Sequence, residues 1–171
     1  SNNLIVTRVV GTGALNSTIG DNAPTSAGKL IKNAEDYDAA TIVNDTLFIA
    51  KYPGTLGNSL KVTVIDSNAW GDTTVNADFI ANFDDTPGTS TDVTNAGGSQ
   101  DEMHVIVIDE DGLWTGTPGY VLEKFAFVSK ASDAKRPEGS SNYIKDVLRN
   151  ESKYVWLGDV TQLTTVSAAA G

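Results

Sequence analysis

Short apolar runs rich in β-branched residues recur along the whole chain, and Gly, Pro, Asn and Asp separate them. Their positions are 4–10, 46–50, 60–65, 103–108, 120–128 and 154–157. Runs of about 4 to 9 residues bounded by turn-forming residues are typical of β-strands. This pattern predicts a mainly β fold and leaves little room for long helices.

The run at 60–65 shows how these strands are expected to lie. Leu60, Val62 and Val64 alternate with Lys61 and Thr63. Successive side chains of a strand point to opposite faces, so the alternation predicts one apolar face and one solvated face. We therefore expect half-buried strands in a mostly antiparallel sheet.

A turn signal follows the run at 103–108. The tetrapeptide at 109–112 reads Asp-Glu-Asp-Gly and precedes Leu113-Trp114. Glycine adopts the positive φ that tight hairpin turns require. The pair Asp111-Gly112 is therefore predicted to turn a hairpin between two strands.

Two helices are expected besides the strands. Residues 142–149 place Tyr143, Ile144, Val147 and Leu148 on one face, and a side chain among 140–142 can cap the start. A short helix is expected near 33–38, capped by Asn33. We predict an α+β, mainly β domain of sandwich or barrel-like form, covering 1–171 as one domain.

Charge is distributed unevenly along the chain. The chain carries 12 Lys+Arg and 22 Asp+Glu, for a net charge of −10. The stretch 62–123 contains no Lys or Arg and twelve acidic residues, so it carries −12 and the flanks together carry +2. Neutralising phosphates requires clustered cations, which excludes nucleic acid and anionic membranes as partners of this stretch.

The centre of this acidic stretch is also poor in apolar residues. Residues 71–100 consist mostly of Thr, Asn, Asp, Gly and Ser. Such a composition is typical of loops and sheet edges. We expect 71–100 to form a flexible acidic loop or edge region within the domain. Nowhere does an apolar run approach the roughly 18 residues of a membrane span.

The residue inventory argues against catalysis. The chain has no Cys and a single histidine, His104, inside an apolar run. A catalytic triad needs a nucleophile and an orienting acid beside the histidine, and the stretch 57–61 lacks the closing glycine of a nucleophile elbow. We expect no enzyme, and an ordinary strand position for His104.

Two ligand motifs are incomplete. Gly11-Thr12-Gly13 follows a strand-like run, but Asn16 replaces the third glycine of a dinucleotide fingerprint, and no helix-forming sequence follows. We expect a flexible exit from a strand there. The acids at 109–111 do not match the register of an EF-hand loop; a weak surface Ca²⁺ site remains the alternative to a solvated turn. We expect no cofactor and no metal.

Aromatic and basic residues suggest contacts instead. Trp70, Trp114 and Trp156 are dispersed and lack basic neighbours, so they are expected in the core or in a subunit contact. Three cations lie in the polar loop before the helix at 142–149, and they could meet an acidic partner: Lys130, Lys135 and Arg136.

Three stretches carry a family resemblance. The first is the strand-like run at 4–10. The second, 50–62, reads A-K-Y-P-G-T-L-G-N-S-L-K-V. The third, 125–156, contains S-N-Y-I at 141–144 and S-K-Y-V at 152–155. Together they resemble tail sheath proteins of contractile-tailed bacteriophages, and the second matches the family pattern A-x-Y-P-G-x-x-G-N-x-L-x-V.

This resemblance implies a structural role. It implies a fragment from the middle, insertion-like domain of a sheath subunit, located in the virion tail after assembly in the host cytoplasm. Sheath subunits surround the tail tube and contract to drive it through the host envelope for DNA delivery. The implied partners are other sheath subunits and, indirectly, the tail tube and baseplate.

From the charge pattern we derive one hypothesis about contacts in such an assembly. The candidate intersubunit residues are acids of the middle stretch and cations of the polar loop: Asp84, Asp85, Lys130, Lys135 and Arg136. Charges at an interface tune register and specificity more than affinity. The alternative is a carbohydrate- or receptor-binding β module, for which Trp70-Gly71-Asp72 is the best candidate and burial of Trp70 the test.

Overall fold

The fold is described from a computed structural model of the chain. It describes residues 10–11, 13–19, 29–42, 46–72, 77–159 and 163. The predicted strand at 4–10 therefore lies almost entirely outside the described residues.

The described strands form two three-stranded sheets. The first has the order β1-β2-β6, and the second β3-β4-β5. Every strand pairing in them is antiparallel, which confirms the α+β, mainly β prediction. Their bounds are β1 Asn16–Ile19, β2 Phe48–Pro53, β3 Leu60–Ile65, β4 Glu102–Asp109, β5 Tyr120–Ser129 and β6 Val155–Leu157.

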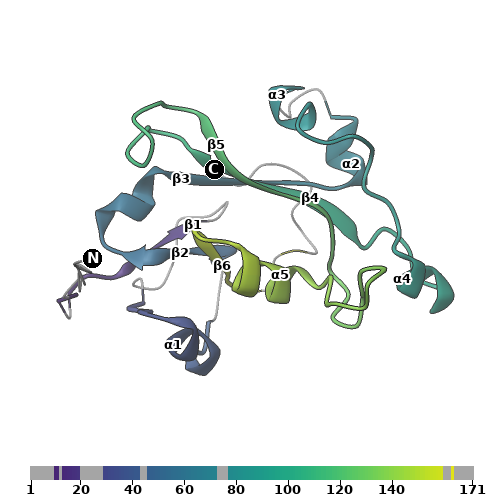
Figure 1. Cartoon of the computed structure of the whole chain (residues 1–171), viewed down its shortest axis with the longest axis horizontal. Helices are drawn as coiled ribbons and strands as arrows, with labels where there is room; N and C mark the ends of the chain where they lie inside the picture. The colour runs from purple at the N-terminus through teal and green to yellow at the C-terminus, as the bar shows by residue number, and fades with distance from the viewer. Residues whose placement is uncertain are drawn as a thin grey trace, which may run out of the picture.

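Short helices connect and cover these sheets (Figure 1). They are α1 Ala34–Ala39, α2 Ser67–Trp70, α3 Ala77–Ile80, α4 Thr91–Asn95 and α5 Ile144–Glu151, with a 3₁₀-helix η1 at Thr55–Ser59. Helix α1 confirms the short helix expected near 33–38. Its cap is also the predicted one, because Asn33 Oδ1 accepts a hydrogen bond from Asp36 N at 2.8 Å.

The main core lies between the two sheets and is closed by α5. Phe48 and Leu157 from the first sheet pack with Val62 and Val105 from the second, and Leu148 comes from α5. All five side chains are buried. Burying each such side chain contributes roughly 1.5–3 kcal/mol, so this shared core is the largest stabilising contact of the fold.

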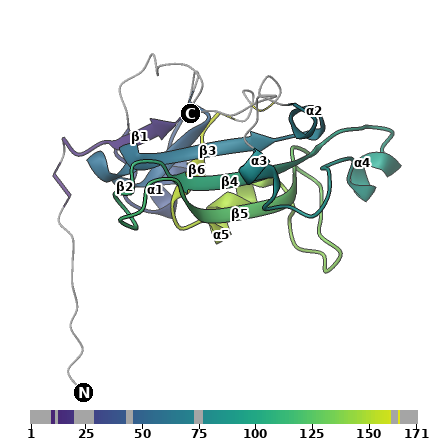
Figure 2. The ribbon, with the colours of Figure 1, turned by 90° about the horizontal axis from the view of Figure 1, so that it is seen from above.

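Each sheet also has a covered outer face (Figures 1 and 2). On the first sheet, Tyr37 of α1 stacks on Trp156 with the ring centroids 4.7 Å apart. On the second sheet, Ala69 of α2 and Phe83 pack against Ile65 and Ile106. The molecule is therefore layered, with helical segments outside both sheets.

This layering corrects the prediction of half-buried strands. The predicted face assignment in β3 holds, since Leu60, Val62 and Val64 all join the main core. The opposite face is only partly solvated, however: Lys61 is partly exposed, but Thr63 is fully buried. The reason is that α2 and the segment around Phe83 cover that face of the second sheet.

Part of the expected acidic loop is ordered into helices. Within 71–100, α3 and α4 each form about one turn, and Ser90 Oγ caps α4 by accepting from Val93 N at 3.4 Å. Phe83 is buried and forms a small core cluster with Ile65 and Ile106, against which Phe79 and Ile80 pack. Phe79, Ile80 and Phe83 are spaced as on one face of a helix, but the Thr, Asn, Asp, Gly and Ser residues around them favoured a loop over this short signal.

Two local predictions differ from the structure. The helix expected at 142–149 begins at Ile144, with Tyr143 as N-cap and no side-chain cap. Asn142, a predicted cap, instead donates from Nδ2 to the carbonyl of Phe127 at 2.7 Å. The expected tight turn at Asp111-Gly112 is a longer loop, because Asp109 pairs with Tyr120. Gly112 does adopt a positive φ of 76°.

Strand β1 was not predicted. Its residues were expected to be a flexible exit from a strand, yet they pair with β2. The side chain of Asn16 explains why this segment forms a strand. Its buried amide donates to the carbonyls of Ile31 and Ala50 at 2.9 and 2.8 Å. Its Oδ1 accepts from Ile31 N at 2.7 Å. These bonds tie three separate segments together, which no local sequence pattern reveals.

Lys51 links β2 to the end of α5. Its Nζ donates to the carbonyls of Leu148, Arg149 and Ser152 at 2.9, 3.2 and 2.6 Å. It also lies 3.7 Å from the ring centroid of Trp156. The last carbonyls of a helix have no partner within the helix, so a cation at this end satisfies them and interacts favourably with the helix dipole.

We expect Lys51→Met to lower the free energy of unfolding by about 1–3 kcal/mol, because it leaves these carbonyls without their donor. Urea denaturation followed by tryptophan fluorescence measures the change. Lys153→Met is the matched control, since Lys153 is exposed. Equal stability losses in the two variants would contradict the linking role of Lys51.

Candidate functional site

The acids proposed as contacts lie on an exposed loop after α3. Asp84 and Asp85 are both exposed. The Asp85 carboxylate accepts a local bond from Thr86 N at 2.8 Å. Within the described ranges, neither residue forms an ion pair with Lys130, Lys135 or Arg136. Their charges therefore remain available to another molecule.

The buried side chain of His104 holds this loop through the backbone of Asp85. Its Nε2 lies 2.8 Å from the Asp85 carbonyl oxygen, and its Nδ1 accepts from Phe127 N at 3.0 Å. The ring stacks on Phe83 with centroids 4.2 Å apart. Burial lowers the pKa of His104, and the hydrogen bond to the Asp85 carbonyl opposes this shift only in part. Both ring nitrogens bond to backbone, so the described residues give His104 no nucleophile to activate.

The basic loop between β5 and α5 holds the three predicted cations in different environments. Arg136 forms a two-pronged ion pair with Glu151, at 2.7 Å for Nη1–Oε1 and 3.2 Å for Nη2–Oε2. This pair raises the pKa of Arg136. Lys135 is exposed and Lys130 partly exposed, and no ion pair engages either within the described part of the chain.

An acid of the middle stretch does reach this loop, but not one of those predicted. Asp92 Oδ2 of α4 accepts from the backbone N of Lys135 at 2.9 Å. Sequence reasoning counted Asp92 among the acids without selecting it. The signal that could have found it is the capping pattern, since Ser90 followed by an acid in the first turn marks a helix start.

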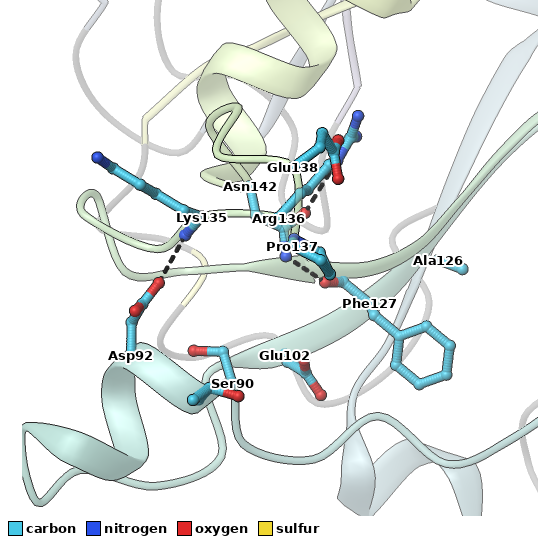
Figure 3. A pocket seen from close by; sticks show the side chains of 11 residues that line it. Ser90, Asp92, Glu102, Ala126, Phe127, Lys135, Arg136, Pro137, Glu138 and Asn142 are labelled. Carbon is cyan, nitrogen blue, oxygen red and sulfur yellow. Dashed lines mark hydrogen bonds between the residues drawn. The ribbon is translucent and has the colours of Figure 1, made fainter.

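A hollow of about 600 Å³ separates α4 from the basic loop. Figure 3 shows Ser90, Asp92 and Glu102 on one side and Lys135, Arg136 and Glu138 on the other. Burial raises the pKa of Glu102, partly offset by its bond from Gly88 N. The hollow is thus lined by charges of both signs, an arrangement suited to polar protein contacts rather than to one charged substrate.

The buried carboxylate of Asp101 fixes the chain next to this hollow. Asp101 accepts from Ser90 N at 2.8 Å and from Ser129 Oγ. Burial alone would raise the pKa of Asp101, but these hydrogen bonds from Ser129 and Ser90 hold it below its usual range. Asp101 therefore ties the start of α4 to the end of β5.

The structure does not support the alternative of a surface Ca²⁺ site at 109–111, because Asp109 is engaged inside the protein. Asp109 is fully buried and accepts from Ser59 Oγ at 2.6 Å and from Thr115 N at 2.8 Å. Its carboxylate points away from solvent, while Glu110 and Asp111 are exposed. No cluster of three or more potential metal ligands occurs among the described residues. Nor is any described helix long and apolar enough to cross a bilayer.

The sugar-platform alternative depends on Trp70. Its indole is partly buried, packs against the second-sheet core and meets His104 edge-on at 5.6 Å. Part of the ring is thus engaged inside the protein. Trp156 is buried and Trp114 partly buried against the main core, in line with the predicted packing role of the tryptophans.

Comparison with known proteins adds one relative. The chain is 34% identical over 117 residues to a tail sheath protein of Salmonella phage ViI, and the match covers 68% of the chain. The matched part makes up 15% of the length of that sheath protein. No model of a known protein family matches the chain, and no solved structure does. The chain is therefore related in sequence to part of a phage tail protein.

We expect the stability of the domain to fall as the pH decreases below about 6.5, the ordinary pKa of histidine. The folded pKa of His104 is lowered, so the unfolded chain binds more protons in this range and protonation favours unfolding. The slope from one such group is at most about 1.4 kcal/mol per pH unit. Urea denaturation between pH 7.5 and 5 measures it.

His104→Asn is the matched control, because asparagine keeps an acceptor and a donor but does not titrate. The chain contains one histidine, so the difference between the two proteins isolates this group. A stability difference that stayed constant from pH 7.5 to 5 would contradict the assignment.

Proposed function

We propose that the chain is part of the contractile tail sheath of a bacteriophage. The observation that carries this proposal is the 34% identity to a tail sheath protein over 68% of the chain. The segment 50–62 supports it, because its sequence A-K-Y-P-G-T-L-G-N-S-L-K-V resembles the sheath pattern. The chain contributes a domain of a structural protein and not an enzyme.

The proposed role is mechanical. Sheath subunits surround the tail tube in the virion, and their contraction drives the tube through the host envelope so that DNA is delivered. A layered domain with a packed core suits this task, because close-packed interiors transmit strain rather than absorb it. The subunits would assemble in the host cytoplasm, with other sheath subunits as direct partners and the tube and baseplate as indirect ones.

The surface charges support contacts between subunits rather than with nucleic acid or membrane. Asp84 and Asp85 present exposed carboxylates that form no ion pair among the described residues, while Lys130 and Lys135 present cations from a separate loop. Arg136 is already paired with Glu151, so it would have to exchange partners in a contact. The proposed electrostatic contact therefore rests mainly on the two lysines of one subunit and the two aspartates of another.

An antibody raised against the 171-residue chain tests the location. Electron microscopy of the phage that encodes the chain should show antibody along the tail shaft, and the labelled region should shorten when tails contract. Antibody on tail fibres or capsids, or none on intact virions, would overturn the proposal.

We expect Asp84→Lys or Asp85→Lys in the full-length subunit to change how contraction depends on salt. Attraction between exposed charges in the extended lattice weakens with ionic strength, because the screening length is about 8–10 Å near physiological salt. Reversal replaces attraction by repulsion, so added salt should then stabilise the extended form. The fraction of contracted tails, counted by microscopy against NaCl concentration, measures this.

Glu35→Lys provides the matched charge change on α1, outside the acidic stretch, where the side chain is also exposed. Each exposed ion pair contributes no more than about 1 kcal/mol, so the shift should be modest per subunit. The hypothesis fails if the aspartate variants keep the wild-type salt dependence, or if the Glu35 variant changes it equally.

A further inference from the structure

A β-bulge in β5 lies opposite His104. The register between β4 and β5 shifts between Met103 and Val105, and the two residues of β5 left over at this shift are Ala126 and Phe127. Phe127 adopts a positive φ of 53°. Glycine is the usual residue for this left-handed conformation in a bulge. A bulky residue in the same conformation is strained, and the surrounding structure has to hold it there.

Two side chains hold the backbone of Phe127 in the bulge. His104 Nδ1 accepts from Phe127 N at 3.0 Å, and Asn142 Nδ2 donates to the Phe127 carbonyl at 2.7 Å. The Phe127 ring also meets the His104 ring edge-on, with the centroids 4.6 Å apart. The imidazole nitrogen therefore serves as the acceptor for a backbone N–H of the interrupted ladder.

These bonds determine the protonation state of His104. A backbone N–H only donates, so Nδ1 carries no hydrogen, and Nε2 donates its hydrogen to the Asp85 carbonyl at 2.8 Å. In the imidazolium form both ring nitrogens are donors. A proton on Nδ1 would then face the N–H of Phe127, and the bond between them could not form. The bulge as folded therefore requires a neutral, fully buried histidine.

Other groups around the ring act in both directions. The Asp85 carboxylate attracts the protonated form, whereas burial lowers the pKa of His104 more strongly. Phe83 stacks on the ring at 4.2 Å and Trp70 meets it at 5.6 Å, and aromatic rings attract a cation. These attractions do not remove the conflict at Nδ1. Further charged groups on the surrounding elements are bonded elsewhere or face solvent: Asp66, Asp84, Asp101, Glu102 and Lys124.

We propose that His104 and the β5 bulge form an acid-sensitive switch, in which a proton on Nδ1 breaks the bond from Phe127 N and the Phe127 backbone leaves its left-handed conformation. Nε2 still donates to the Asp85 carbonyl in the protonated form, so the loop that contains Asp85 stays in place. The switch is a property of the folded chain and does not depend on the sheath assignment.

The change at the bulge reaches the basic loop through Asn142. Its Nδ2 bonds to the Phe127 carbonyl, and its Oδ1 accepts from Arg136 Nε at 3.4 Å. Phe127, Asn142 and Arg136 all line the hollow beside α4 (Figure 3). When Phe127 moves, Asn142 loses its partner and the wall of the hollow changes. The proton thus acts on a surface that His104 itself does not touch.

The direction of the pH response follows from proton binding. The closed bulge excludes the proton, while the open form binds it with an ordinary histidine pKa of about 6.5. The open form therefore gains population as the pH falls below this value. Between pH 7.5 and 5 we expect the ratio of open to closed bulge to rise by about thirtyfold.

Two substitutions of one residue test the role of the bulge. Phe127→Gly and Phe127→Ala both remove the ring, but only glycine adopts a positive φ without strain. The ring resonances of His104, the one histidine of the 171 residues, are followed by NMR against pH. We expect the pKa of His104 to be lower in Phe127→Gly than in Phe127→Ala by about 0.5, because glycine favours the closed bulge. Equal pKa values in the two proteins would mean that burial alone excludes the proton, and would overturn the switch.

The unmodified chain provides a second test that needs no variant. The scalar coupling between Phe127 N and His104 Nδ1 across their hydrogen bond should be visible at pH 7.5, and the side-chain amide of Asn142 should shift along the His104 titration curve. The amide of Phe48 in the first sheet should not. A constant Asn142 amide would show that the proton stays without effect on the bulge. A Phe48 amide that changed on the same curve would show unfolding of the whole domain instead of a local switch.

Discussion

The fold depends on the burial of apolar side chains between two small antiparallel sheets. A three-stranded sheet has two faces and cannot bury both by itself, so each sheet uses the other for one face. Helix α5 closes this shared core with Leu148, and Lys51 holds the end of that helix through three carbonyls. The outer faces are then covered by α1 and by the segment from α2 to Phe83. All surface loops project from this layered scaffold.

Buried polar groups determine where those loops go. His104 holds the Asp84–Asp85 loop by its backbone, Asp101 holds the start of α4, and Asp109 holds the loop between β4 and β5. A buried polar group that lost its partners would cost about 1–3 kcal/mol, so each bond set favours one loop position strongly. Each of these loops is thereby held to the scaffold by a buried side chain.

Sequence and structure support the sheath proposal in different ways. Identity to a phage tail sheath protein and the segment at 50–62 give the relationship. The structure supplies the charged surfaces: aspartates without ion pairs in the described chain, and a basic loop in which Arg136 is already paired.

The sequence by itself determined the positions of β2 to β6, the antiparallel pairing and the short helix capped by Asn33, because periodicity and capping are local properties of neighbouring residues. It also placed Leu60, Val62 and Val64 on one face. Only the tertiary structure decided that Thr63 is buried, that Asn16 begins a strand and that Asp92 rather than Asp84 reaches the basic loop. Each of these depends on segments far apart in the chain, and long-range contacts leave no periodic signal in the sequence.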